Sequence, residues 1–325
     1  MSARIRSAGL AVFWLALALV PAQPQPYPAR PITIVVPLPP GGSNDIMARA
    51  IADKLAASLG QPVVVENRAV GASGTVGTRS AARAAPDGYT LLLGFTSTLA
   101  TAPSMYRNVG YDPRKDFAPV GLIAWAPSLL LVHPSLPARS VADLIAMMKS
   151  STEPFQVGTP GIGTVNHLAS ELFARQAGVK VEQIPYKGSS PLSTDLMGGH
   201  VKVGFNPIPV SRAAMDGGFI RALAATSMKR STLLPDLPTV AEAGLPGFDV
   251  VLSYGLVAPA STPRPIIERL NRELRAALAT EEVRRRLLQE GAEPMPSTPE
   301  EQAAVIDREE TKWSALIKAV GIRPE

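Results

Sequence analysis

Short glycine-containing turns are the segments of this chain whose residues could bind a ligand. The first, residues 37–45, has the sequence PLPPGGSND and stands between a run of β-branched residues and the start of a helical pattern. A helix begins with N–H groups that lack partners, and these groups together with the helix dipole attract anions. The residues that such an anion site would use are Pro39, Gly41, Gly42, Ser43 and Asp45. The alternative is a tight turn in which glycine provides a positive φ and Asp45 stabilises the start of the helix.

A second turn of the same kind, residues 158–167, reads GTPGIGTVNH and also joins a predicted strand to a predicted helix. Thr164 is the expected N-cap, and the residues that could contact an anion are Gly161, Gly163, Thr164 and His167. Neither turn is a nucleotide loop, because no Lys-Ser or Lys-Thr pair follows at the Walker spacing and no third glycine completes a dinucleotide motif. An anion site and a purely structural turn remain alternatives here too.

Polar side chains follow other predicted strands as well, and they include Thr96, Ser97, Tyr186 and Lys187. Lys187 could attract an anion or could be one more surface lysine. The turns that follow the first predicted strands contain no Lys or Arg; they are residues 37–45, 94–98 and 158–167. An anion bound there would therefore meet backbone N–H groups, hydroxyls and water.

These turns require strands that end at one edge of a sheet. Continuous β-branched runs at residues 32–36 and 63–65 are typical of strands covered on both faces of a parallel sheet. Between them a helix begins near Ser43 or Asn44 and ends at Gly60, which predicts a right-handed β-α-β unit of an α/β fold. Further strands are predicted at residues 89–93, 156–158, 181–184, 201–205 and 221–225. Helix starts in the C-terminal third are predicted at Thr262, Thr280 and Thr298.

The N-terminal residues have the pattern of a secretory signal peptide. Arg4 and Arg6 precede an apolar run from residue 8 to residue 20, and small residues follow it through Ala22. This run is shorter than the roughly 20 residues that a membrane-spanning helix needs, so a retained anchor is the weaker alternative. We therefore expect residues 1–22 to be a signal peptide that is removed, residues 23–31 to be an extended leader, and the mature chain to reside in the periplasm.

Composition argues against several classes of protein. The chain has no cysteine, which excludes a disulfide, a thiolate metal site and a lipid-modified cysteine. Its aromatic content of 5% and its scattered Lys and Arg residues do not suggest nucleic-acid binding. The histidines form no His-Glu-x-x-His pair, and the chain has no Gly-x-Ser-x-Gly elbow. We expect no metal, no cofactor and no enzymatic activity, and we interpret His167 as a packing or capping residue.

Over most of its length the chain resembles the periplasmic receptors of tripartite tricarboxylate transporters, also called the Bug family. The motifs that carry the resemblance lie between Tyr27 and Ile322. They are YPxxP at 27–31, PxPPGGxxDxxAR at 37–49, GQPVVVENR at 60–68, PDGYTLL at 86–92, GxG and HLA within 161–169, PYKG at 185–188, RSxxLPDLPT at 230–239, AEAG at 241–244, APA at 258–260 and KW at 312–313.

The resemblance implies a type II periplasmic-binding-protein fold, with two α/β lobes joined by crossing segments and a ligand cleft between them. It places lobe 1 at residues 32–125 and 253–325 and lobe 2 at residues 126–252. The turns at residues 39–45 and 161–167 would approach from opposite lobes and clasp a ligand carboxylate, partly through ordered water.

Three positions depart from the pattern of the family and concern the distal part of the ligand. The family commonly has Ser, Asp and Trp where this chain has Thr164, Asn206 and Tyr254. Thr164 retains the hydroxyl, whereas Asn206, which we include among the ligand-binding residues, loses a charge.

The function that the resemblance implies is capture of a small carboxylate, whether a dicarboxylate, an aromatic acid or an amino acid. A monomeric receptor would close on this ligand by a hinge motion and deliver it to the subunits of a membrane permease. One alternative is a receptor that presents its closed form to a two-component sensor kinase. A carboxylate-processing enzyme is a weaker alternative, because motifs for a nucleophile, a metal or a cofactor are missing.

Overall fold

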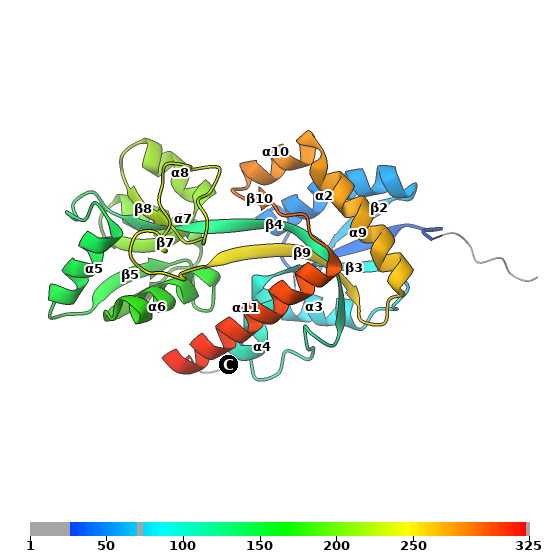
Figure 1. Ribbon diagram of the computed structural model, residues 1–325, viewed down its shortest axis with the longest axis horizontal. Coiled ribbons are helices and arrows are strands. Elements are labelled where there is room, and N and C mark those ends of the chain that lie inside the picture. Colours follow the sequence, from blue (N-terminus) through cyan, green and yellow to red (C-terminus); the bar gives the residue numbers. More distant parts are fainter. Residues whose placement is uncertain (1–26, 70–73, 323–325) are drawn as a thin grey trace, which may run out of the picture.

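The computed structural model describes residues 27–69 and 74–322, so the predicted signal peptide lies outside the described residues. These residues form two α/β lobes around a sheet with the strand order β2-β1-β3-β9-β4-β7-β5-β6, in which β10 and β8 also pair with β4. Figure 1 shows the lobes at opposite ends of the molecule, with β4 and β9 running between them. The predicted α/β class with two lobes is confirmed.

The first lobe is built on parallel strands with helices on both faces. Its strands are β1 (Ile32–Val36), β2 (Val63–Asn67), β3 (Thr90–Phe95) and the short β10 (Glu293–Pro294). Its helices are α2 (Ser43–Leu59), α3 (Thr75–Ala82), η2 (Ser97–Thr101), α4 (Ala102–Met105), α9 (Arg264–Ala279) and α10 (Glu281–Gln289). β1 pairs in parallel with β2 on one side and with β3 on the other, as the β-branched runs predict.

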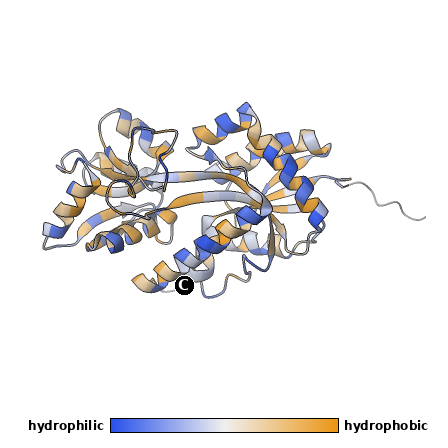
Figure 2. Cartoon of the chain, viewed as in Figure 1, coloured by the Kyte–Doolittle hydropathy of each residue, from blue (hydrophilic) through white to orange (hydrophobic). Residues whose placement is uncertain are grey.

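The second lobe has a similar construction. Its strands are β5 (Phe155–Thr159), β6 (Val181–Pro185), β7 (Val203–Pro207) and β8 (Arg221–Ala225). Its helices are α5 (Val141–Ser150), α6 (Val165–Ala177), α7 (Ser189–Met197) and α8 (Ile208–Asp216). β5 pairs in parallel with β6 and β7. Figure 2 shows hydrophobic residues concentrated on the strands and on the inner faces of the helices in both lobes.

Two strands join the lobes, and neither was predicted from the sequence pattern. β4 (Phe117–Val132) pairs with β9 (Val251–Pro259) as far as Pro127, and from Ser128 onward it pairs with β7. β4 therefore leaves the sheet of one lobe and enters the sheet of the other without interruption. The two prolines of β4 hid it from the sequence analysis, because proline usually argues against a long strand.

The C-terminal helix, α11 (Pro299–Val320), packs against both lobes. It begins with the predicted cap at Thr298, whose hydroxyl accepts a hydrogen bond from the N–H of Glu301. Further along, the fully buried Trp313 belongs to the hydrophobic core that contains Phe173 and Phe205 of the second lobe. Lys312 donates a hydrogen bond to the carbonyl of Asp249 at 3.0 Å. α11 is thus a third link between the lobes (Figure 1).

Most predicted helix boundaries are confirmed. Thr164 caps α6 through its side chain, and Gly60 ends α2 in the left-handed conformation. The cap of α2 differs from the prediction, because Gly42 is the N-cap and both Ser43 and Asn44 lie inside the first turn. The side chain of Asp45 accepts the N–H of Gly41 and holds the turn close to the helix, so the helix begins directly after Gly42.

The predicted polar turn at residues 94–98 is wrong. Strand β3 continues through Phe95, and the helical turn η2 begins at Ser97. Thr98 is fully buried, and its hydroxyl bonds to both the N–H and the carbonyl of Phe95. The hydroxyl groups satisfy the end of the strand from inside the lobe, so their polarity does not indicate an exposed turn.

The start of α9 also differs from the prediction, because Pro263 and not Thr262 is its N-cap. Thr280 does precede α10, although its side chain makes no capping hydrogen bond. No helix in residues 27–69 and 74–322 has the length and apolar character needed to cross a membrane.

The packing of α11 predicts a large cost for removing Trp313. We expect Trp313→Ala to lower the free energy of unfolding by about 3–5 kcal/mol, because it leaves a cavity where α11 meets the second lobe. Urea denaturation followed by circular dichroism measures this. The control is Phe219→Ala, since Phe219 is 59% exposed and its loss should change stability by about 0.5 kcal/mol or less. Equal effects of the two substitutions would contradict the described packing.

Candidate functional site

A cleft of about 690 Å³ lies between the lobes. Residues of both lobes and of the crossing strands line it. They are Leu38, Pro39, Pro40, Gly41, Gly42, Ser43, Asn44, Phe95, Ser97, Ala126, Pro127, Ser128, Pro160, Thr164, Val165, Asn166, Ser189, Pro207, Pro209, Val210, Leu252, Tyr254, Glu290 and Gly291. The first turn and part of the second turn singled out in the sequence therefore meet across one space.

Several helices begin at this cleft. The first residues of α2, η2, α6, α7 and α8 either line it or adjoin residues that do. The strands before them end at the same place, so the positive ends of the helix dipoles converge there. No Lys, Arg or His is among the residues that line the cleft in the described structure. The cleft can therefore attract an anion by means of backbone N–H groups and dipoles alone.

The first turn is held in shape by Asp45, which lies beneath it and does not line the cleft. Oδ2 of Asp45 accepts the N–H of Gly41 at 3.0 Å and the Nε–H of Arg49 at 3.0 Å, and Oδ1 lies 3.0 Å from Nη2 of Arg49. Burial alone would raise the pKa of this carboxyl, but the hydrogen bonds from Arg49 and Gly41 hold the pKa below its ordinary value. Asp45 is therefore ionised and serves the geometry of the turn.

The second turn is organised around Thr164 and His167. The Thr164 hydroxyl donates to the carbonyl of Gly161 at 2.8 Å and accepts the N–H of His167 at 3.2 Å. The N–H of Gly163 donates to Nδ1 of His167 at 3.1 Å, which requires an unprotonated Nδ1. Burial lowers the pKa of His167. Of these four predicted residues only Thr164 lines the cleft, while the others support it.

Two asparagines that the sequence analysis did not select are the most informative polar residues of the cleft. Asn44 and Asn166 are each 7% exposed, and each is the second residue of its helix. Nδ2 of Asn44 and Oδ1 of Asn166 are buried without a hydrogen-bond partner among the described residues. A buried polar atom without a partner costs about 1–3 kcal/mol, so Nδ2 of Asn44 needs an acceptor and Oδ1 of Asn166 needs a donor, such as a water, that the chain does not supply. Both lie within the predicted turns, residues 37–45 and 158–167, and that position was the signal that could have identified them.

The remaining predicted site residues lie behind the lining, apart from Ser97, which is part of it. The Thr96 hydroxyl accepts the N–H of Ser253 at 2.8 Å and so anchors β9. The amide of Asn206 is fully buried and donates to the Ser193 hydroxyl at 2.9 Å and to the carbonyl of Ser189.

Tyr186 and Lys187 also lie outside the lining of the cleft. The Tyr186 hydroxyl donates to Asp195 at 2.8 Å, and burial together with this carboxylate raises the pKa of the tyrosine to about 12. The structure thus brings Pro39, Gly41, Gly42, Ser43, Ser97 and Thr164 together in the cleft.

Glu290 and Tyr254 complete the lining on the side of the first lobe. The Ser43 hydroxyl donates to Oε2 of Glu290 at 3.0 Å. Burial, with a smaller contribution from Glu290, raises the pKa of Tyr254, so its hydroxyl stays protonated at neutral pH. Neither residue has a charged partner within ion-pair distance in the described structure.

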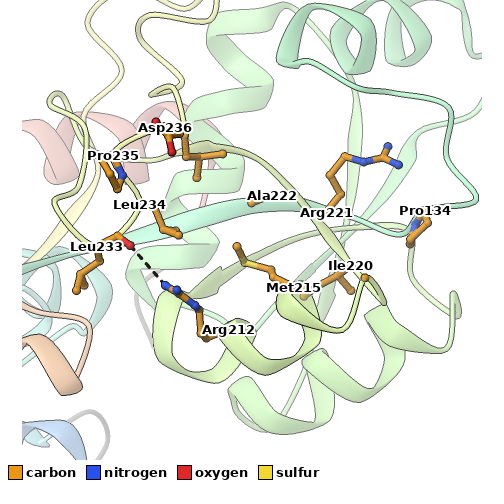
Figure 3. Close-up of a pocket in the computed structure, with 12 residues that line it drawn as sticks. Pro134, Arg212, Met215, Ile220, Arg221, Ala222, Leu233, Leu234, Pro235 and Asp236 are labelled. Carbon is orange, nitrogen blue, oxygen red and sulfur yellow. Dashed lines mark hydrogen bonds between the residues drawn. The ribbon is translucent and has the colours of Figure 1, made fainter.

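A second hollow, of about 660 Å³, lies on the outer surface of the second lobe (Figure 3). Its two arginines are already engaged, since Arg212 donates to the carbonyl of Leu233 and Arg221 donates to the carbonyl of Ala138. Its lining contains none of the buried polar atoms that lack a partner. Within the described residues no cluster of potential metal ligands is found either. The cleft between the lobes is therefore the candidate site.

Comparison with known proteins gives the same picture. The family model described as tripartite tricarboxylate transporter family receptor matches residues 47–322. Protein BugT of Bordetella pertussis (strain Tohama I) is 39% identical over 304 residues, which are 93% of each chain. A solved R. palustris structure with adipate is 38% identical, has a TM-score of 0.77 and covers 92% of this chain and 100% of its own. MatC from Rhodopseudomonas palustris with bound malate is 35% identical, with a TM-score of 0.73, and covers 90% and 100%.

The depressed pKa of His167 predicts a loss of stability in mild acid. Folding favours the neutral imidazole, so its stabilising contribution is fully present above the unfolded pKa of about 6.5 and is lost as the pH falls from there toward the folded pKa. Protonation of Nδ1 would also break the bond from Gly163. We expect the free energy of unfolding to fall more steeply below about pH 6.5 in the wild type than in His167→Asn, whose amide oxygen can accept the same N–H.

Urea titrations at a series of pH values measure this difference. Glu171, whose carboxylate lies 3.7 Å from Nε2 of His167, is present in both proteins, so the comparison isolates the imidazole. Parallel pH profiles of the two proteins would rule out the assigned role of His167.

Proposed function

The chain belongs to the tripartite tricarboxylate transporter receptor family, and we propose that it binds a small carboxylate between its lobes and delivers it to the permease of such a transporter. As a member of this family it is a solute-binding receptor and not an enzyme. The observation that carries the proposed ligand class is the set of helix starts that line one cleft from both lobes, together with the buried Nδ2 donor of Asn44, which has no acceptor among the described residues.

The chemistry of the cleft fits a carboxylate that is held by hydrogen bonds. Since no Lys, Arg or His lines it in the described residues, the ligand would meet first-turn N–H groups, the hydroxyl of Ser97 and Nδ2 of Asn44, while Oδ1 of Asn166 would accept from a bridging water. A hydrogen bond to a charged group contributes about 1.5–3 kcal/mol, so about four of them supply the roughly 8 kcal/mol of micromolar binding. The similar proteins solved with adipate and malate support this class of ligand.

Binding by groups from two lobes implies closure about the crossing strands. We place the division between the lobes at residues 125 and 126 and again at 252 and 253, next to the point where β4 exchanges β9 for β7 as its partner. In an open form each lobe would offer the ligand only half of its hydrogen bonds, so affinity depends on closure. Presentation of the closed form to a sensor kinase instead of a permease uses the same motion.

The predicted export of the chain is consistent with its family. Its solved relatives include the periplasmic binding protein BugD, which is 36% identical to it. We propose that residues 1–22 direct export to the periplasm and that the mature protein acts there as a monomer.

The unpartnered amides predict which substitutions abolish binding. We expect Asn44→Ala and Asn166→Ala each to weaken binding of a carboxylate by about 10–100-fold, because the first removes the Nδ2 donor and the second removes the Oδ1 acceptor of a water that bridges to the ligand. Isothermal titration calorimetry measures this, with adipate, malate and the best acid from a thermal-shift screen as ligands. Neither substitution should lower stability much, since neither amide atom has a partner in the protein.

Asn271→Ala provides the matched control. Its amide donates to the carbonyls of Val120 at 2.7 Å and Ser297 at 2.8 Å, away from the cleft. This substitution should therefore lower stability and leave affinity unchanged. If all three variants bound the acid as the wild type does, the proposed site would be incorrect.

Closure predicts a more compact complex. We expect the radius of gyration from small-angle X-ray scattering to decrease when a saturating carboxylate is added, because the lobes rotate toward each other around β4 and β9. The matched sample is Asn166→Ala at the same ligand concentration, which should remain extended. An unchanged radius for a wild-type sample that calorimetry shows to be saturated would exclude the hinge.

A further inference from the structure

Glu290 gives the cleft a charge of its own. Among the residues that line the cleft in the described structure, it is the one with a formal charge at neutral pH. A receptor for dicarboxylates gains nothing from a carboxylate in its own site, because like charges repel at short distance. The presence of Glu290 therefore bears on which carboxylate the protein accepts.

No basic side chain of the described residues forms an ion pair with Glu290. It is the C-cap of α10, where the negative end of the helix dipole lies, and its N–H bonds to carbonyls of that last turn. Oε2 accepts the Ser43 hydroxyl at 3.0 Å, and Oε1 has no hydrogen bond to a described residue. The nearest basic residue along the helix, Arg286, lies instead beside Asp53 at 3.7 Å and Glu282 at 3.6 Å.

Lysine does not neutralise this carboxylate either. Lys54, on the neighbouring α2, pairs with Glu282 at 2.7 Å. The carboxylate of Glu290 thus enters the cleft without a cationic partner in the described part of the chain. A cation that neutralises it would have to arrive with the ligand.

The two sides of the cleft consequently differ in polarity. The second lobe contributes the starts of α6, α7 and α8, and no acidic side chain lines the cleft there. In the first lobe the start of α2 already has a carboxylate beside it, because Ser43 is the first residue of that helix and bonds to Glu290. A ligand carboxylate is therefore favoured toward the second lobe, and a positive group is favoured toward the first.

Building on the function proposed above, we propose that the cleft selects a zwitterion, that is, a carboxylate that also carries an ammonium group. The carboxylate binds at the helix starts of the second lobe, where Oδ1 of Asn166 accepts from a water that bridges to it. The ammonium group donates to Glu290, and Tyr254 lies beside it. Glu290 then serves as a specificity determinant that favours amino acids and disfavours diacids of the same length.

Two matched ligand series test this by isothermal titration calorimetry. Succinate, malate and aspartate share one carbon skeleton and differ by a hydrogen, a hydroxyl or an ammonium group. Glutarate, 4-hydroxybutyrate and 4-aminobutyrate differ at the terminal group. In at least one series we expect the ammonium compound to bind at least tenfold tighter than the other two members. This preference should disappear in Glu290→Gln, which keeps an acceptor for Ser43 and removes the charge.

Glu281→Gln is the control, because Glu281 is exposed on the same helix and outside the cleft, and it makes the same change in net charge. It should leave both series unchanged. If Glu290→Gln changed all members of a series by the same factor, Glu290 would only position Ser43, and the inference would be overturned while the proposed function stood. A wild-type preference for diacids, or for the hydroxyl compounds, would overturn it as well.

If none of the six compounds bound, the inference would also fail. The thermal-shift screen of other carboxylates would then decide separately on the proposed function.

Discussion

Parallel pairing in each lobe is the constraint on which the rest of the structure depends. When neighbouring strands run in the same direction, they end at one edge of the sheet, and the helices that follow begin there. β1 precedes α2, and β5 precedes α6, so each lobe presents a helix start at its edge. Because the two edges face each other, the cleft collects unpaired N–H groups and dipoles from both lobes.

The link between the lobes decides how these edges meet. β4 serves both sheets, with β9 as its partner on one side of Pro127 and β7 on the other. The pairing passes directly from Pro127, opposite Val251, to Ser128, opposite Pro207, so one strand belongs to both sheets. α11 adds a packed contact through Trp313, so the same chain that begins in the first lobe ends against the core of the second.

Within this frame the cleft is polar without basic side chains. The N–H groups and dipoles that would hold an anion belong to the fold of each lobe, and closure of the lobes would bring both sets to one ligand. Asp45 and His167 contribute indirectly. Each accepts an N–H of its glycine turn and thereby fixes the orientation of the neighbouring groups. In the proposed mode of binding, Glu290 distinguishes the two ends of a ligand.

Local patterns in the sequence determined the elements. Runs such as residues 32–36 indicated buried strands, and Thr164, Gly60 and Thr298 marked helix ends, because capping and hydrophobic periodicity act over a few residues. The family motifs added the two-lobed arrangement. The two glycine turns were found in this way, together with the absence of Lys and Arg within them.

Tertiary structure alone decided which atoms face the cleft. Asn44 and Asn166 line the cleft, whereas the next residues, Asp45 and His167, lie beneath it. Neighbouring residues of a helix point about 100° apart, so the rotation of each helix about its axis decides which of them faces the cleft, and no spacing in the sequence specifies that rotation. The contact between Ser43 and Glu290 joins residues 247 positions apart. No local signal connects such residues, because their proximity results from the packing of α10 on α2.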